Sequence, residues 1–140
     1  MGVGIDAVDV DRFRATLDRR PALRQRLFTE AEQTYADRAA DPTERLAARF
    51  AAKEATMKAL GVGIGAFPFT DVEVVRHHPE APELVLHRSA AALAERAGVG
   101  RWHLSLTHTG SMALASVAAE RVAPVGPPAA GPPVAGTAGG

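Results

Sequence analysis

The chain has no cysteine, no excess of charge of either sign and no long apolar run. The lack of cysteine excludes disulfides, Cys-ligated zinc and thiol catalysis. Sixteen basic and sixteen acidic residues cancel, which argues against a general nucleic-acid binder. No segment is long enough to span a membrane, and Asp6, Asp9 and Asp11 stand where a signal peptide needs basic and then apolar residues. We therefore expect a soluble, cytoplasmic protein.

Bulky side chains are also scarce, because 29 of the 140 residues are alanine and only 5% are aromatic. A chain of this length and composition can fill one modest core, and such subunits often bury more surface by self-association. From residue 123 to 140 the chain has five Pro, five Gly, five Ala and no charge. This segment cannot bury enough surface to offset its ordering entropy. We expect one domain over residues 1–122 and a disordered, dispensable tail over residues 123–140.

Apolar periodicity and capping residues predict helices placed between antiparallel strands. Alternation predicts a strand over residues 3–8, with Asp6 on the face opposite Val3 and Ile5. Asp9, a Thr29–Glu32 capping box, Asp41 and Ser89 are the helix start signals. They predict helices over 10–20, 30–40, 42–60 and 90–98, and alternation predicts further strands over 71–77, 83–87, 102–107 and 112–118. This pattern indicates an α+β domain with one long central helix against a small antiparallel sheet.

The long helix is apolar nearly all round, which is typical of a buried helix. It nevertheless carries Arg49, Lys53, Glu54 and Lys58. Burying these charges without partners is costly, so they must contact one another, a ligand or a water-filled cleft. The two lysines are the only ones beside fourteen arginines, which indicates sites that need a compact ammonium. An ordinary i, i+4 ion pair between Glu54 and Lys58 is the alternative.

Two acidic side chains could form a metal site. Asp6, in the first strand, is either an ordinary turn or cap acid or a partner of Glu54. If the two carboxylates converge, their hard oxygens beside basic side chains suit Mg²⁺ bound jointly with phosphate oxygens.

Other polar features allow a functional or a structural interpretation. Six arginines against two aspartates between residues 11 and 26 form either a solvated helix face or a docking surface for an acidic macromolecule. His108 and Thr109 at a hairpin tip are either turn residues or phosphate contacts. Ser105 near His108 does not make a serine hydrolase, because no oxyanion hole is indicated. The glycines over 61–65 follow a helix rather than a strand and fail the context of a phosphate loop.

Three motifs occur in a specific order: Gly4-Ile5-Asp6, then Arg49-Phe50-Ala51-Ala52-Lys53-Glu54-Ala55 with Lys58-Ala59-Leu60-Gly61, and finally Ser105-Leu106-Thr107-His108. Over residues 3–120 this resembles the holo-acyl-carrier-protein synthases, the small single-module 4′-phosphopantetheinyl transferases. The resemblance implies their fold and the Mg²⁺-dependent transfer of 4′-phosphopantetheine from coenzyme A to a serine of an apo acyl carrier protein. Adenosine 3′,5′-bisphosphate would be released, and the enzyme would be a homotrimer with sites between subunits.

The resemblance also implies residue roles. Asp6 and Glu54 would hold the metal, and Lys58 would neutralise charge on the transferring phosphate, so these three form the expected catalytic set. Coenzyme A would be bound by Lys58 and, at its nucleotide end, by Arg49, His108 and Thr109. Arg12 and Arg19 would contact the acidic carrier protein, which favours the docking interpretation of the basic run.

The sequence departs from the family pattern in three places. Phe50 stands where many relatives have tryptophan, the turn over 79–82 lacks the usual glycine, and the segment after Glu120 has no counterpart. A catalytically silent module that binds coenzyme A or a carrier protein is the alternative function. A purely structural oligomer would leave the charges of the long helix unexplained.

Overall fold

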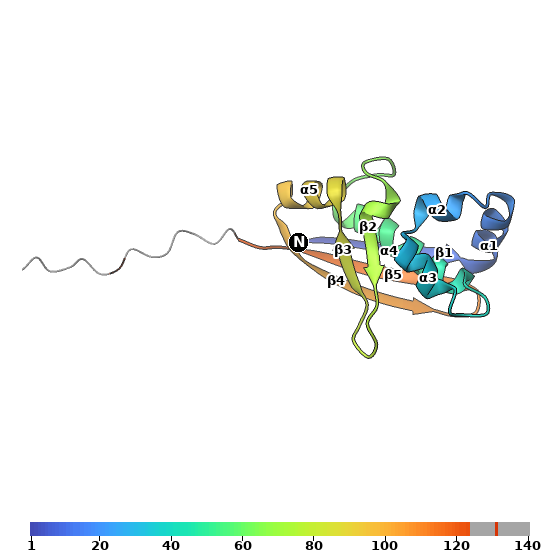
Figure 1. Ribbon diagram of the computed structural model, residues 1–140. Helices are drawn as coiled ribbons and strands as arrows, with labels where there is room; N and C mark the ends of the chain where they lie inside the picture. The colour runs from blue at the N-terminus through green and yellow to red at the C-terminus, as the bar shows by residue number, and fades with distance from the viewer. Residues whose placement is uncertain (124–130, 132–140) are drawn as a thin grey trace, which may run out of the picture.

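The computed structural model describes residues 1–123 and residue 131, so the predicted tail lies almost entirely outside the described residues, and the division at residue 122 stays a prediction. Figure 1 shows the described elements. They are β1 (Gly2–Asp9), α1 (Val10–Arg19), α2 (Leu23–Leu27), α3 (Glu30–Ala36), α4 (Thr43–Ala59), the 3₁₀ helix η1 (Phe69–Asp71), β2 (Val72–Val75), β3 (Glu83–Leu86), α5 (Arg88–Arg96), β4 (Val99–His108) and β5 (Met112–Arg121). The predicted α+β class with one long helix is confirmed.

The strands form two antiparallel sheets with α4 packed between them. The larger sheet has the order β1-β5-β4, and β2 pairs with β3 in a separate hairpin. Helix α4 packs against β1 and β5 on one side and against β2 on the other. Helices α1 to α3 gather at one end of the sheet and α5 lies at the other (Figure 1). No helix among the described residues is long and apolar enough to cross a membrane.

Glycines of β1 let α4 lie directly on the strand. A Cβ atom on Gly4 would stand 1.9 Å from the carbonyl oxygen of Ala55, and one on Gly2 would stand 2.0 Å from that of Ala59. No side chain fits in this space, which explains both the glycines and the alanines that face them. The close approach brings Asp6, two residues after Gly4, beside the helix.

The alternation predicted for β1 is confirmed: Val3 and Ile5 point away from α4, whereas Val8 packs against the core that contains the helix. Val3 is 71% exposed and Ile5 is 65% exposed, whereas Gly4 is buried and Asp6 lies on the helix side. The described chain therefore leaves one face of its larger sheet partly apolar and uncovered.

Two of the predicted helix starts are confirmed at the level of the cap. The Asp9 Oδ1 atom accepts from the Arg12 amide at 2.9 Å, and Thr29 and Glu32 form a complete capping box. The helix after Thr29 ends at Ala36. Residues 37–40, which are predicted to extend it, form a turn and a bend instead.

Two other starts differ from the prediction. Helix α4 begins at Thr43, whose amide donates to Asp41 Oδ1 at 3.0 Å, so Asp41 caps one residue further from the helix than expected. Ser89 does not cap α5: the helix begins at Arg88, and the Ser89 hydroxyl donates to Asp71 at 2.6 Å. A distant carboxylate thus satisfies this helix end, a contact that local sequence does not reveal.

Candidate active site

Asp6, Glu54 and Lys58 lie together where β1 passes α4. The Lys58 ammonium donates to Asp6 Oδ1 at 3.1 Å and to the carbonyl oxygen of Ile5 at 2.9 Å. Lys58 therefore pairs with the strand carboxylate, and the ordinary i, i+4 ion pair with Glu54 is absent from the ion pairs of the described chain.

The two carboxyl groups influence each other strongly. Burial and then the neighbouring Asp6 raise the pKa of Glu54 to about 7, and Lys58 opposes this shift. The second Asp6 oxygen, Oδ2, is buried and has no hydrogen-bond partner. Like charges that share a site repel each other, so the protonated form of Glu54 is favoured unless a cation neutralises the repulsion.

This donor set fits a hard divalent cation. The orphaned Oδ2 atom of Asp6 and the carboxylate of Glu54 supply two oxygen ligands, and Mg²⁺ commonly takes one or two carboxylates and completes its shell with water and phosphate. Within the described residues no group of three or more His, Asp or Glu side chains could hold a metal. A metal bound here would therefore need oxygen ligands from water or substrate.

A mostly apolar groove of about 430 Å³ opens beside Glu54. Arg12 stands on its lining, and Arg19, two turns along α1, is exposed. The apolar part of the lining comes from six elements or loops and consists of Ala7, Val8, Phe13, Leu23, Leu27, Phe50, Ile64 and Phe69. An apolar groove whose lining also includes Arg12 and Glu54 thus lies beside α4.

Arg49 and His108 lie on another side of α4. They line a cavity of about 470 Å³ together with Tyr35, Arg45 and Arg76. Because Arg49 and Glu54 are five residues apart on the helix, their side chains leave it about 140° apart. A single chain thus places the two halves of the predicted site on different sides of α4.

The hairpin between β4 and β5 holds His108 and Thr109. The Nδ1 atom of His108 lies 2.6 Å from Glu44 Oε1, and both side chains are substantially exposed. The Thr109 hydroxyl accepts from the Met112 amide at 3.2 Å, which closes the turn. Thr109 has a structural contact here, while His108 stands at the cavity.

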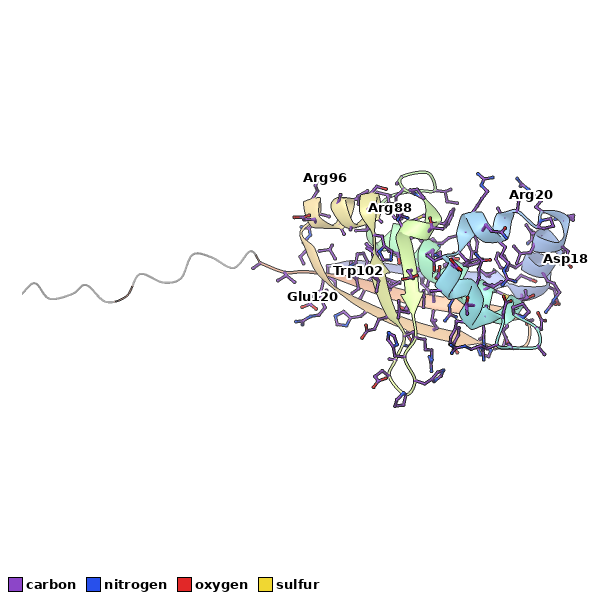
Figure 2. The ribbon with its side chains drawn as sticks, in the orientation of Figure 1. Asp18, Arg20, Arg88, Arg96, Trp102 and Glu120 are labelled. Carbon is purple, nitrogen blue, oxygen red and sulfur yellow. The ribbon has the colours of Figure 1, made fainter. Side chains whose placement is uncertain are left out.

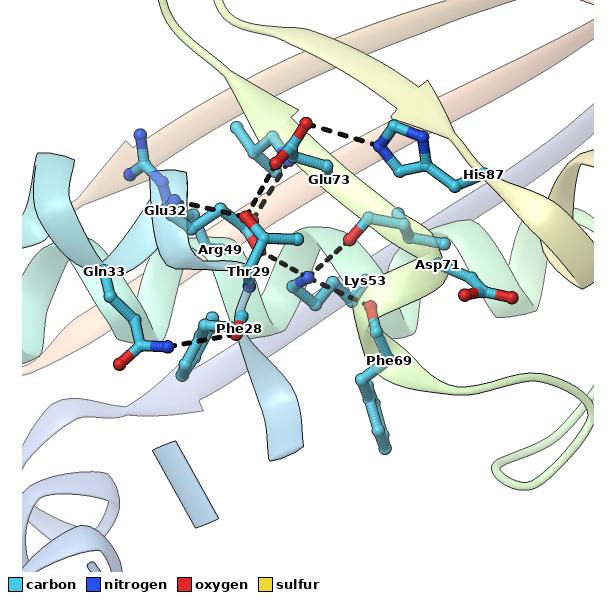
Figure 3. Close-up of polar contacts among 12 residues, drawn as sticks. Phe28, Thr29, Glu32, Gln33, Arg49, Lys53, Phe69, Asp71, Glu73 and His87 are labelled. Atoms are coloured by element: carbon cyan, nitrogen blue, oxygen red, sulfur yellow. Dashed lines mark hydrogen bonds and ion pairs between the residues drawn. The ribbon is translucent and has the colours of Figure 1, made fainter. Parts of the chain in front are cut away.

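Lys53 lies in a different environment from the one that the sequence predicts, because it is buried against another helix. Its ammonium is fully buried, lies 2.7 Å from Glu32 Oε1, and also donates to the carbonyl oxygens of Phe69 and Val72 (Figure 3). The expectation that the charges of the long helix meet one another, a ligand or water is wrong for Lys53, because α3 supplies its partner. A compact ammonium does suit this place, since three oxygens surround it closely.

The sequence analysis does not identify two residues that contact the charged side chains of α4. These are Glu32, which contacts Lys53, and Tyr35, which contacts Arg49. The sequence predicts Glu32 only as the second half of a capping box, yet the same carboxylate accepts from Lys53 and, at 3.0 Å, from the Val74 amide. The Tyr35 ring lies 4.3 Å from the Arg49 guanidinium. Tyr35 follows Glu32 by three residues on a predicted helix, and residues with this spacing share a helix face. This spacing is the one sequence signal that could have linked the two residues.

Comparison with known proteins adds independent findings. The model of a protein family described as the 4′-phosphopantetheinyl transferase superfamily matches residues 2–115. A holo-[acyl-carrier-protein] synthase of Frankia alni is 51% identical over 120 residues, which cover 86% of this chain and 97% of the relative. The synthase of Moorella thermoacetica is 43% identical over 112 residues, which cover 80% of this chain and 88% of the relative.

Solved structures of synthases superpose on this fold. The holo-[acyl-carrier-protein] synthase of Neisseria meningitidis matches with a TM-score of 0.79 and 33% identity, covering 86% of this chain and 98% of that one. The Bacillus anthracis enzyme, described in complex with CoA (3′,5′-ADP), matches with a TM-score of 0.72 and 34% identity, covering 86% and 96%.

The fold and the matched family model define a small α+β transferase built around one central helix. The chain belongs to the 4′-phosphopantetheinyl transferase superfamily. The predicted enzyme class, a 4′-phosphopantetheinyl transferase of the holo-acyl-carrier-protein synthase kind, is confirmed.

Proposed function

We propose that this enzyme transfers 4′-phosphopantetheine from coenzyme A to a serine of an apo acyl carrier protein, with Mg²⁺, and releases adenosine 3′,5′-bisphosphate. The observation that carries the proposal is the cluster of Asp6, Glu54 and Lys58, in which one carboxylate oxygen is buried without a partner and the pKa of Glu54 is raised to about 7. The relatives' activity and the coenzyme A complex of a related structure support the choice of substrates.

Each residue of the cluster has a role in this reaction. Asp6 and Glu54 would hold Mg²⁺, which supplies charge neutralisation at the pyrophosphate of coenzyme A. The Lys58 side chain is 55% exposed, so its ammonium can turn from Asp6 to the transferring phosphate. The carrier's serine oxygen forms the new bond to phosphorus while the bond to the bridging oxygen breaks. The serine proton passes to Glu54 or Asp6, and the electron pair leaves with adenosine 3′,5′-bisphosphate.

The reaction is tested by incubating the protein with coenzyme A, Mg²⁺ and several apo carrier proteins, and weighing each carrier by intact mass spectrometry. We expect a gain of one phosphopantetheine group that disappears with EDTA. No gain on any carrier, with coenzyme A binding intact, would instead support a catalytically silent binding module. A comparison of carriers identifies the preferred one.

The groove beside Glu54 provides a surface for the carrier protein. Arg12 lines it and Arg19 follows on the same face of α1, so an acidic carrier would meet positive charge next to the carboxylate cluster. The apolar lining offers contact area that the arginines alone would lack. This arrangement supports Arg12 and Arg19 as carrier contacts.

Replacing Arg12 and Arg19 with glutamine is expected to raise the KM for the carrier while kcat at saturation stays unchanged. The difference from wild type should shrink as salt rises from about 0.05 M to about 0.5 M, because exposed charges are screened. Arg96→Gln is the matched control, since Arg96 is exposed on α5 at the opposite end of the molecule (Figure 2). A salt-independent effect, or an equal effect of the control, would argue against electrostatic docking at α1.

The two halves of the predicted site lie on different sides of α4 in one chain, which supports an assembly of several subunits. Arg49 and His108 of one subunit would complete the site formed by Asp6 and Glu54 of the next, in a homotrimer. The exposed apolar face of the larger sheet, which presents Val3 and Ile5, offers a surface to bury. Sedimentation of the active enzyme tests this assembly, and full activity in a monomeric species would contradict it.

A further inference from the structure

Three arginine side chains surround one aromatic ring on the cavity that Arg49 and His108 line. The guanidinium carbons of Arg38, Arg45 and Arg49 lie 5.7, 4.8 and 4.3 Å from the centre of the Tyr35 ring. The ring face is negative, so each contact is attractive. Among the described residues, no ion pair joins any of these three arginines to a carboxylate. Asp41 and Glu44 also line this cavity, but they pair with Arg14 and His108. The three arginines therefore have an aromatic support and no ion-paired carboxylate.

Arg49 is the most restricted of the three. It is only 4% exposed, its Nε atom is buried without a hydrogen-bond partner, and Nη1 donates to the Arg45 carbonyl oxygen at 3.3 Å. Burial lowers the pKa of its guanidinium. Arg76, which lines the same cavity, also has a buried Nε atom without a partner. Two guanidiniums that each keep an unbonded N–H donor thus lie at one cavity, and a phosphate group accepts from several N–H donors at once.

The helix that carries Tyr35 is locked to α4 by a buried ion pair. Glu32, one turn before Tyr35 on α3, accepts from the Lys53 ammonium of α4 and from the Val74 amide of β2. Both ionic side chains are fully buried, so solvent cannot compete for this contact. Figure 3 shows the pair beside Arg49. With α3 held in this way, the Tyr35 ring keeps one position under the Arg49 guanidinium.

We propose that Tyr35 is a positioning residue for phosphate binding by Arg49: its ring orients the unpaired guanidinium toward the cavity, and the Glu32–Lys53 ion pair holds the ring in place. The inference rests on the proposed function, because the phosphate concerned is the one at the nucleotide end of coenzyme A. A guanidinium already oriented loses little side-chain freedom when the phosphate binds.

The test compares Tyr35→Leu with Tyr35→Phe in the full chain, by calorimetric titration with two nucleotides. Adenosine 3′,5′-bisphosphate carries the additional phosphate and adenosine 5′-monophosphate does not. Tyr35→Leu should weaken binding of the bisphosphate between about 3-fold and about 30-fold, the range of an aromatic contact to a guanidinium. It should leave the monophosphate unchanged, and Tyr35→Phe, which keeps the ring, should bind both nucleotides as wild type does.

A second background separates positioning from a structural effect. In an Arg49→Gln protein, the additional Tyr35→Leu change should have no further effect on bisphosphate affinity. Equal weakening for both nucleotides, or the same weakening without Arg49, would overturn the inference. If wild type binds the bisphosphate and Tyr35→Leu binds it equally well, the inference fails while the proposed function stands. A wild-type protein that binds neither nucleotide and modifies no carrier would overturn both.

Discussion

Glu54→Gln is expected to lower turnover about 100-fold to 1,000-fold, the usual cost of removing one preorganised electrostatic contact. The change leaves a single carboxylate at the candidate metal site, and that carboxylate, Asp6, is already paired with Lys58 at 3.1 Å. Affinity for the carrier should be largely retained, since Arg12 and Arg19 are untouched. Turnover is measured by the mass gain of the carrier, and affinity by titration of the carrier.

Thermal unfolding provides the control for Glu54→Gln. Because the pKa of Glu54 is raised to about 7, its protonated form favours the folded state at low pH, and that contribution is lost as pH rises through about 7. At pH 8 without metal, glutamine removes the repulsion from Asp6, so the variant should unfold no earlier than wild type. Wild-type turnover in the variant would contradict the metal assignment. A lower unfolding temperature at pH 8 would contradict the repulsion between the carboxylates.

Lys53→Met is expected to destabilise the fold by about 3–5 kcal/mol, because it leaves the fully buried Glu32 carboxylate without its cation. The carbonyl oxygens of Phe69 and Val72 lose their donor at the same time. Chemical denaturation of the purified protein measures the change. Lys58→Met is the matched control, since Lys58 is on the same helix but 55% exposed, and its effect should stay within about 1 kcal/mol.

A double variant tests the cause of the Lys53 effect. Glu32→Gln combined with Lys53→Met leaves no buried charge, keeps an oxygen acceptor for the Val74 amide, and should recover much of the lost stability. If the double variant is as unstable as Lys53→Met alone, the stranded carboxylate is not the cause. In that case, lost packing or the two carbonyl oxygens would account for the effect.

Local patterns predicted most of the helices and strands, because their causes are local. The caps at Asp9 and Thr29 act within three residues, and the apolar character of the long helix is visible in its composition. Helix α2 (Leu23–Leu27) was not predicted, since it is one short turn without a side-chain cap. Ser89 was misassigned because Asp71, 18 residues away, supplies the contact.

For the candidate site too, some features follow from the sequence and others only from the tertiary structure. The sequence by itself determined the enzyme family and the identity of the residues proposed to act, because Asp6, Glu54 and Lys58 lie in ordered motifs. Only the tertiary structure decided that Lys58 contacts Asp6, that Lys53 pairs with Glu32, and that Arg49 rests on Tyr35. These partners are 21 or more residues apart, or on different helices, and no local pattern encodes which buried charge meets which. That pairing follows from how the elements pack, since each buried ion must find an oxygen or a cation within the space that packing leaves.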